Sequence, residues 1–195
     1  MKPFTSSLLL VLLAAWLISA TPLVAQTSNV DRAEILWAGT YNAQIVGTVN
    51  QPDTAAGRTN KLGQIQKLET TTTIRGRLGA NFGFEYALSG TPAGAHAAIE
   101  ITVLLPEPGL LNPATGKRTL RERWQPSPSL VGGATVVGYR FEKDWEILPG
   151  LWKFEIGHHG RKLGEQSFCV LAEPSPAPAE GGGDKKDPCH SAATA

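Results

Sequence analysis

Three carboxylates alternate with large apolar side chains near residue 145. Glu142, Asp144 and Glu146 occupy every second position between residues 141 and 147. On an extended strand they would share one face at a spacing of about 7 Å, so their oxygens could converge on Ca²⁺. Calcium takes about 6 to 8 oxygen ligands, more than one strand supplies. We therefore interpret the row as a solvated polar face, with a cation site as the alternative; an acid/base pair for glycoside hydrolysis would also need a cleft.

Two adjacent histidines, His158 and His159, stand between glycines in a predicted hairpin turn. An exposed imidazole that is neutral near pH 7 is a good ligand for Zn²⁺ or Cu²⁺. Adjacent residues of a strand point to opposite faces, however, and only His96 and His190 remain as further imidazole ligands. The pair is therefore interpreted as turn histidines, with a transition-metal site as the alternative.

Cationic side chains gather directly before a tryptophan. Lys117, Arg118, Arg121 and Arg123 precede Trp124, which is the tryptophan most expected to be exposed because a proline-containing loop follows it. Guanidinium groups bind carboxylates and phosphates, and aromatic rings stack on sugars and bases. Arg121, Arg123 and Trp124 are therefore candidate ligand-binding residues for an anionic polymer or a polysaccharide. The preferred interpretation is nevertheless a charged loop and edge strand that blocks edge-to-edge pairing, with its arginines paired to the acidic row.

The chain has two cysteines, Cys169 and Cys189. Cys169 alternates with apolar neighbours in a predicted strand, so its thiol is expected off the core face. In an oxidising compartment the two are expected to form an intramolecular disulfide. Free thiols or a bridge to a partner are the alternatives.

The elements that must position these residues are predicted to be strands. Residues 82–88 and 99–105 place apolar side chains at every second position, and residues 152–156 and 168–170 do so around a turn at 157–160. Further strands are expected within residues 35–49, as one long or two short strands, and within 68–74, 119–124 and 135–141. No segment has an apolar helical period sustained over three turns. The pattern predicts an all-β fold, an antiparallel β-sandwich of about seven strands, with a small barrel as the alternative.

The N-terminus is typical of a secretory signal peptide. Lys2 precedes an almost unbroken apolar run over residues 8–18, and small residues follow up to Ala25. The run is shorter than the roughly 20 residues that span a bilayer, so we expect cleavage and no stable membrane span, with an uncleaved anchor as the alternative. We divide the chain into the signal peptide (1–25), a short linker (26–32), the sandwich (33–171) and a disordered tail rich in proline and glycine (172–195).

Charge and motifs exclude several functions. The formal net charge is +1, so no broad basic field exists to gather nucleic acid, and no nucleic-acid partner is expected. The sequence contains no G-x-S-x-G, H-E-x-x-H, C-x-x-C or G-x-x-x-x-G-K-[ST] motif. We therefore expect no enzyme activity and no cofactor. Localisation is predicted to be periplasmic or secreted.

The second half of the chain resembles a known bacterial family. The motif NPATGK over residues 112–117 and the segment at 139–170, YRFEKDWEILPGLWKFEIGHHGRKLGEQSFCV, are similar to the family known as domain of unknown function 3859. The resemblance extends over residues 33–171 and includes FGFEYALSGTPAG. It implies an exported immunoglobulin-like domain of bacteria and carries no activity, because the family is uncharacterised.

Three functional hypotheses follow. The preferred one is a non-catalytic module that binds an envelope protein or polysaccharide through loops 106–117 and 125–133, because loops on a rigid sandwich usually carry function. The second is a divalent-metal-binding module that uses the histidine pair or the acidic row. The third is a hydrolase, which would require a deep pocket with at least two titratable groups of shifted pKa. The oligomeric state is not predicted.

Overall fold

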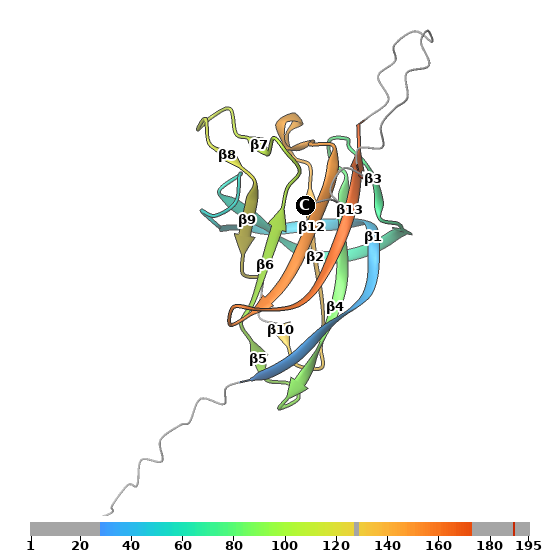
Figure 1. The fold of residues 1–195 in the computed structure, drawn as a ribbon. Helices are drawn as coiled ribbons and strands as arrows, with labels where there is room; N and C mark the ends of the chain where they lie inside the picture. Colours follow the sequence, from blue (N-terminus) through green and yellow to red (C-terminus); the bar gives the residue numbers. More distant parts are fainter. Residues whose placement is uncertain (1–27, 127–128, 173–188, 190–195) are drawn as a thin grey trace, which may run out of the picture.

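Two sheets face each other, and β4 (Asn81–Thr91) is an inner strand of the first (Figure 1). The computed structural model describes residues 28–126, 129–172 and 189. The first sheet has the order β11 (Ala134–Arg140), β4, β1 (Asn29–Asn50) and β2 (Arg58–Thr70). The second has the order β3 (Thr73–Arg75), β13 (Arg161–Leu171), β12 (Gly150–His158), β6 (Ile99–Leu104) and β9 (Arg121–Trp124). The predicted β-sandwich is confirmed, and the barrel is not formed.

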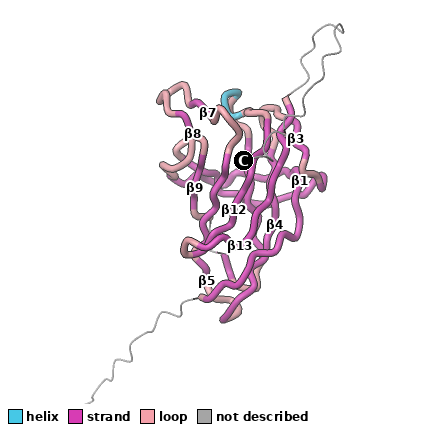
Figure 2. Tube along the Cα trace, in the orientation of Figure 1, coloured by secondary structure: helices cyan, strands magenta, loops and turns pink. Residues whose placement is uncertain are grey.

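Short ladders and one helical turn complete the described part of the chain. β5 (His96–Ala97) pairs with β10 (Ser129–Leu130), and β7 (Leu110–Leu111) pairs with β8 (Arg118–Thr119). All ladders of the two sheets are antiparallel except β13 with β3. Figure 2 shows a single helical turn among the strands, the 3-10 helix η1 (Asp144–Glu146). The two main sheets together hold nine strands, more than the about seven expected. β9 lies within the predicted segment 119–124, whereas most of β2 was not predicted.

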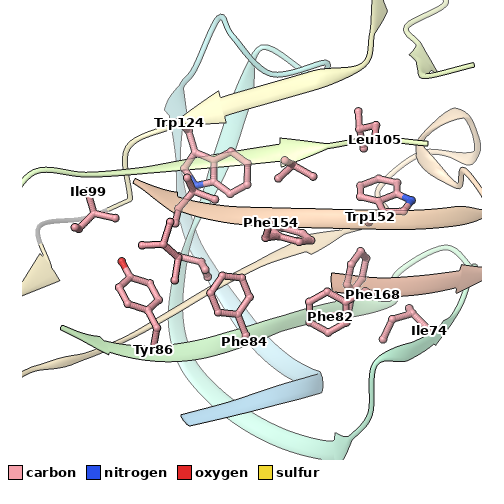
Figure 3. Packing of buried hydrophobic residues seen from close by; sticks show 14 of the residues in the cluster. Ile74, Phe82, Phe84, Tyr86, Ile99, Leu105, Trp124, Trp152, Phe154 and Phe168 are labelled. Carbon is pink, nitrogen blue, oxygen red and sulfur yellow. The ribbon is translucent and has the colours of Figure 1, made fainter. Parts of the chain in front are cut away.

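Aromatic rings from both sheets meet in the core. Phe82 on β4 lies with its ring centroid 5.8 Å from that of Trp152 on β12 and 5.3 Å from that of Phe168 on β13. Figure 3 shows these side chains pointing toward one another between the layers, with Phe84 and Phe154 beside them. Each of these five side chains is fully buried. The alternation predicted for residues 82–88 and 152–156 therefore places the expected faces inward.

β1 is one strand that serves two partners. Its first half pairs with β4, from Asn29 opposite Thr91 to Thr40 opposite Phe82, and its second half pairs with β2. The prediction that residues 26–32 form a linker is wrong from Asn29 onward. Val30 is buried in the core, and the guanidinium of Arg161 donates hydrogen bonds to the carbonyls of Val30 and Asp31. These contacts are long-range, so local sequence could not reveal them.

The outermost predicted segments lie beyond the described residues. The signal peptide (1–25) is outside them, as is nearly all of the predicted tail (172–195). Within the described part, no helix is long and apolar enough to cross a membrane.

A disulfide joins Cys169 of β13 to Cys189, with a Cα–Cα distance of 5.6 Å. Cys169 is half-buried, while its strand neighbours Phe168 and Val170 are fully buried. The bridge therefore lies off the core face, as the alternation predicted. Its sequence separation is 20 residues.

We expect the Cys169→Ser, Cys189→Ser double variant to remain folded. Its free energy of unfolding should fall by no more than about 3 kcal/mol, the chain-entropy value for a loop of this length, because no core contact is lost. Urea denaturation followed by tryptophan fluorescence measures this difference. An unfolded double variant would contradict the peripheral position of the bridge.

Candidate functional site

A cavity lies at one open side of the sandwich, between the edge strands β9 and β11. Its volume is about 420 Å³. The second half of β1 and most of β2 line it, and we call this hairpin, residues 41–67, the arm. We call the space the edge cavity. Its polar and aromatic lining comes from the arm, β9, β11 and η1: Tyr41, Arg58, Asn60, Lys61, Asn81, Glu122, Trp124, Tyr139, Arg140, Glu142 and Glu146.

The tip of the arm is fastened to β9. Figure 1 shows β1 and β2 running across the molecule toward the side where β9 lies. The backbone N–H of Ala55 donates to Oε1 of Glu122 at 2.7 Å, and the N–H of Arg123 donates to the carbonyl of Asp53 at 3.1 Å. The side-chain amide of Asn112 donates to the carbonyl of Ala55 at 2.8 Å. These bonds hold the arm over the edge cavity.

Glu122 is a buried carboxylate at the wall of the cavity. It is 1% exposed, because the alternation of β9 turns Glu122 and Trp124 inward opposite Val103 and Ile101. Burial raises the pKa of Glu122 to about 7, although the hydrogen bond from Ala55 opposes the rise; the charge of Glu146 adds to it. The carboxyl is therefore poised to titrate near neutral pH.

The acidic row does not form. Residues 144–146 are the 3-10 helix η1 rather than a strand, so the predicted alternation at 141–147 is wrong. Glu146 is buried, and its Oε2 accepts hydrogen bonds from the backbone N–H groups of Glu142 and Lys143. Those bonds satisfy amides at the start of the turn, which explains why the chain bends there. Asp144 is exposed outside the cavity, whereas Glu142 and Glu146 both line it.

Glu142 and Glu146 have opposite electrostatic surroundings. Burial acts to raise the pKa of Glu142, but hydrogen bonds from Asn60 and Arg58 outweigh it, and the pKa is lowered. The Arg58 guanidinium lies 3.1 Å from Oε2 of Glu142, so this carboxylate is paired. For Glu146, burial raises the pKa against the backbone bonds that favour the charged form. One cavity thus holds a carboxyl that is charged at neutral pH and two that resist ionisation.

Two tyrosines complete the polar lining. Burial raises the pKa of both Tyr41 and Tyr139, and the nearby carboxylates, first Glu122, raise that of Tyr139 further. Tyr41 crosses β11 where residue 138 is glycine: a Cβ there would lie 2.6 Å from the Tyr41 hydroxyl, so only glycine permits this approach. Neither phenol makes a hydrogen bond within residues 28–126 and 129–172, and both line the cavity.

The structure divides the predicted ligand-binding stripe between two faces of β9. Trp124 is 8% exposed and lines the cavity, so the expectation that it is an exposed tryptophan is wrong. It is buried because it pairs opposite Ile101 and faces the core. Arg121 and Arg123 are exposed on the opposite face, and Arg123 pairs with Glu100 at 3.3 Å. Neither arginine pairs with the acidic residues of the cavity.

The histidine pair also differs from the prediction. His159 is exposed in the turn with φ of 49°, but His158 ends β12, is buried, and faces inward. Its Nδ1 lies 2.8 Å from the carbonyl oxygen of Ala98, and its Nε2 has no hydrogen-bond partner. The turn begins at His159, two residues later than expected, because β12 continues its alternation to His158. Among the described residues, no three His, Cys, Asp or Glu side chains are grouped so that they could hold a metal ion.

Sequence reasoning missed several residues of the cavity. Glu122 stands between two arginines and reads as part of a charged strand, yet its position two residues before Trp124 places it on the same face. That spacing is the one signal that could have found it. Tyr41, Arg58 and Asn60 gave no signal, because only the fold of the arm brings them to β9 and η1.

Among curated proteins, no chain matches significantly. An immunoglobulin-like protein from Pseudomonas aeruginosa is similar in structure, with a TM-score of 0.50 and 24% identity over 76% of this chain and 99% of that one. This likeness identifies the fold as an immunoglobulin-like β-sandwich.

Two further structures resemble parts of the fold more weakly. An alkylpurine DNA glycosylase from Pseudomonas fluorescens bound to DNA containing an abasic site analogue has a TM-score of 0.36 and 16% identity, covering 52% of this chain and 28% of that one. A β-glucosidase from Listeria innocua in complex with glucose has a TM-score of 0.32 and 7% identity, covering 69% and 16%. This chain spans less than a third of either enzyme, and these two likenesses support no functional argument.

A family comparison agrees with the motifs in the second half of the chain. Residues 41–170 match the family described as "Domain of unknown function (DUF3859)". The match begins within β1 and spans the arm and every residue named above as lining the edge cavity. On this evidence the chain belongs to the DUF3859 family.

Proposed function

We propose that the protein is an exported, non-catalytic module that binds an envelope polysaccharide or protein partner, with the edge cavity as its binding site. The observation that carries this proposal is the cavity itself, whose volume of about 420 Å³ lies in the usual range of ligand pockets, roughly 300–1,000 Å³. Its lining combines aromatic and aliphatic side chains with a few placed polar groups, which is typical of ligand sites.

This proposal moves the binding site from the loops to the cavity that they border. Gln125 and Pro126, at the start of loop 125–133, line the cavity. Asn112, in loop 106–117, holds the arm that covers it. The exposed Arg121 and Arg123 face away, so in this proposal they are not ligand contacts.

Two features support export. Residues 8–18 have the composition of a signal-peptide apolar segment. The Cys169–Cys189 disulfide fits an oxidising compartment, since cytosolic thiols are kept reduced. Both features support a periplasmic or secreted location.

The test measures binding of envelope-type sugars to the purified protein expressed from the full-length sequence. Oligosaccharides of N-acetylglucosamine, glucosamine and glucuronate provide neutral, cationic and anionic probes. We expect one of them to raise the melting temperature saturably, because a ligand that binds only the folded state stabilises it. Isothermal titration calorimetry then gives the affinity.

A pair of variants on one strand places the site. Val136 lines the cavity, and Val136→Phe should weaken binding by about tenfold or more, because a larger ring occupies ligand space. Ala134 lies two residues earlier on the same face of β11, is exposed and lies outside the lining, so Ala134→Phe should bind as the wild type does. Equal binding by both variants would exclude the edge cavity. If no oligosaccharide binds, the polysaccharide branch of the proposal is overturned.

Hydrolysis is a second candidate, favoured by one observation. Glu122, with its pKa raised to about 7, and Glu142, with its pKa lowered, line the same cavity. Carboxyl groups whose pKa values are pushed apart are the arrangement of a general acid with a base or nucleophile. Chromatography of the oligosaccharides after incubation separates the candidates: cleavage fragments that disappear in Glu122→Gln would identify a hydrolase, and intact oligosaccharides support binding alone.

A further inference from the structure

Two carboxylates in the edge cavity have no cationic partner. Glu122 and Glu146 are 1% and 3% exposed. Their hydrogen bonds come from neutral backbone N–H groups of Ala55, Glu142 and Lys143. Neither takes part in an ion pair within the described part of the chain, whereas Glu142 in the same cavity is paired with Arg58. Burial without an ion pair disfavours the charged form of both carboxyls, so a cation bound beside them would stabilise that form.

No described cation forms an ion pair with these two carboxylates, although the charge of Lys117 acts to lower the pKa of Glu122 and that of Lys143 acts to lower the pKa of Glu146. Arg58 is bound to Glu142, and the Arg140 guanidinium donates to Oδ1 of Asn81 at 3.3 Å. Lys61 is exposed on the arm. The carboxylates also repel each other: the charge of Glu146 is one of the causes that raise the pKa of Glu122.

Independent of the carboxylates, the phenols have unused hydrogen-bonding capacity. Tyr41 is 2% exposed, lines the cavity and makes no hydrogen bond among the described residues. Tyr139 is likewise without a bond and lies within electrostatic range of Glu122 and Glu146. Both tyrosines line the cavity, so their hydroxyls are available to hydrogen-bond a ligand that enters it.

The chemistry of this lining selects one class of ligand group. Ionised carboxylates only accept hydrogen bonds, and phenol oxygens can accept them. The faces of Trp124 and Tyr139 favour a positive charge placed near them. A primary ammonium group brings three donors and one positive charge, and thus matches the carboxylates, the phenol oxygens and the ring faces.

We propose that the edge cavity recognises a ligand through a primary ammonium group, bound by the carboxylates of Glu122 and Glu146. An amino sugar or a similar compact polar amine has this chemistry. The inference rests on the proposed function, because it assigns the ligand class of the same cavity.

The experiment compares probes that differ in the amino group. Glucosamine and N-acetylglucosamine share one ring, but acetylation removes the charge and two of the donors. Calorimetry on the full-length protein should give at least about tenfold tighter binding of glucosamine, the discrimination expected for hydrogen bonds to charged groups. Glu122→Gln keeps an oxygen for the Ala55 N–H and should reduce glucosamine affinity by about tenfold or more, without reducing N-acetylglucosamine affinity.

A matched variant and a competing cation complete the design. Glu69 is exposed on β2 and lies outside the cavity lining, so Glu69→Gln should bind glucosamine as the wild type does. Equal affinity for the two sugars, with loss of both in Val136→Phe, would overturn the ammonium inference and leave the binding function intact. No binding of either sugar or of 1,5-diaminopentane would overturn the inference. Tighter binding of Ca²⁺ than of any amine, lost in Glu122→Gln, would assign the carboxylates to a metal instead.

Discussion

Replacing Phe82 with alanine is expected to cost about 4 kcal/mol of folding free energy, the largest effect of any single substitution considered for this protein. Phe82 is fully buried on β4, and its ring contacts rings from both sheets. The partners within ring-contact distance are Tyr139, Phe141, Trp152, Phe154 and Phe168. Removing it leaves a cavity that a sandwich with two rigid layers cannot close, so the cavity cost adds to the lost burial.

Urea denaturation of Phe82→Ala against the wild type measures this loss. Domains of this size are stable by about 5–15 kcal/mol, so the variant should have a much lower midpoint and is expected to be close to unfolding at 37 °C. Leu36→Ala is the control, because Leu36 is an exposed residue, at 50%, on the neighbouring strand β1. It should change stability by about 0.5 kcal/mol or less. A loss below about 1 kcal/mol in Phe82→Ala would mean that the two layers do not meet at this ring.

Glu122→Gln is expected to stabilise the protein above neutral pH. The pKa of Glu122 is raised from 4.5 to about 7 in the folded protein, chiefly by burial. The folded state therefore binds more protons than the unfolded state between these values, and stability falls as pH rises through that window. A rise of this size corresponds to about 3 kcal/mol, which is present below pH 4.5 and lost above pH 7. Glutamine has no charge to bury and retains a carbonyl oxygen for the Ala55 N–H.

Unfolding free energies at pH 5 and pH 8 test this linkage. The wild type and Glu122→Gln should be nearly equal at pH 5, and the variant should be more stable by about 3 kcal/mol at pH 8. Glu146, whose pKa is also raised, adds to the decline of the wild type with pH, and Glu142, whose pKa is lowered, opposes it. Comparing wild type with variant isolates Glu122. A variant that is destabilised equally at both pH values would show that the surroundings of Glu122 do not disfavour its charged form.

The second prediction bears on function. If Glu122→Gln unfolds less readily than the wild type, the native carboxylate lowers the stability of the fold. Residues that lower stability in this way are concentrated at functional sites. The same variant is expected to lose affinity for an amine. Stability and binding would then change in opposite directions, which a purely structural role for Glu122 does not produce.

Several elements could be predicted from the chain alone. Alternation at 82–88 and 152–156 identified the inward faces of β4 and β12, and the glycines at 157 and 160 marked the hairpin between β12 and β13. The face of Cys169 followed from its buried neighbours. In each case the signal is the period of a strand, which depends only on consecutive residues.

The candidate site depended on contacts that no local pattern contains. The alternation of Arg121, Glu122, Arg123 and Trp124 was visible in the sequence, but it did not indicate which face of this strand would be buried. The two arginines were predicted to bind the ligand, yet they lie on the exposed face. The segment at 141–147 alternated as a strand does, yet it turns into η1, because Glu146 bonds to backbone amides instead of extending.

The sequence by itself therefore determined the all-β class, the main inward faces, the hairpin and the family. Tertiary structure alone decided that β1 continues into an arm, that the arm reaches β9, and that Glu122, Glu142 and Glu146 share one cavity with Tyr41 and Tyr139. The physical reason is range: strand periodicity is set by neighbours two residues apart, whereas the Ala55–Glu122 bond joins residues 67 positions apart, and only the folded chain brings such partners together.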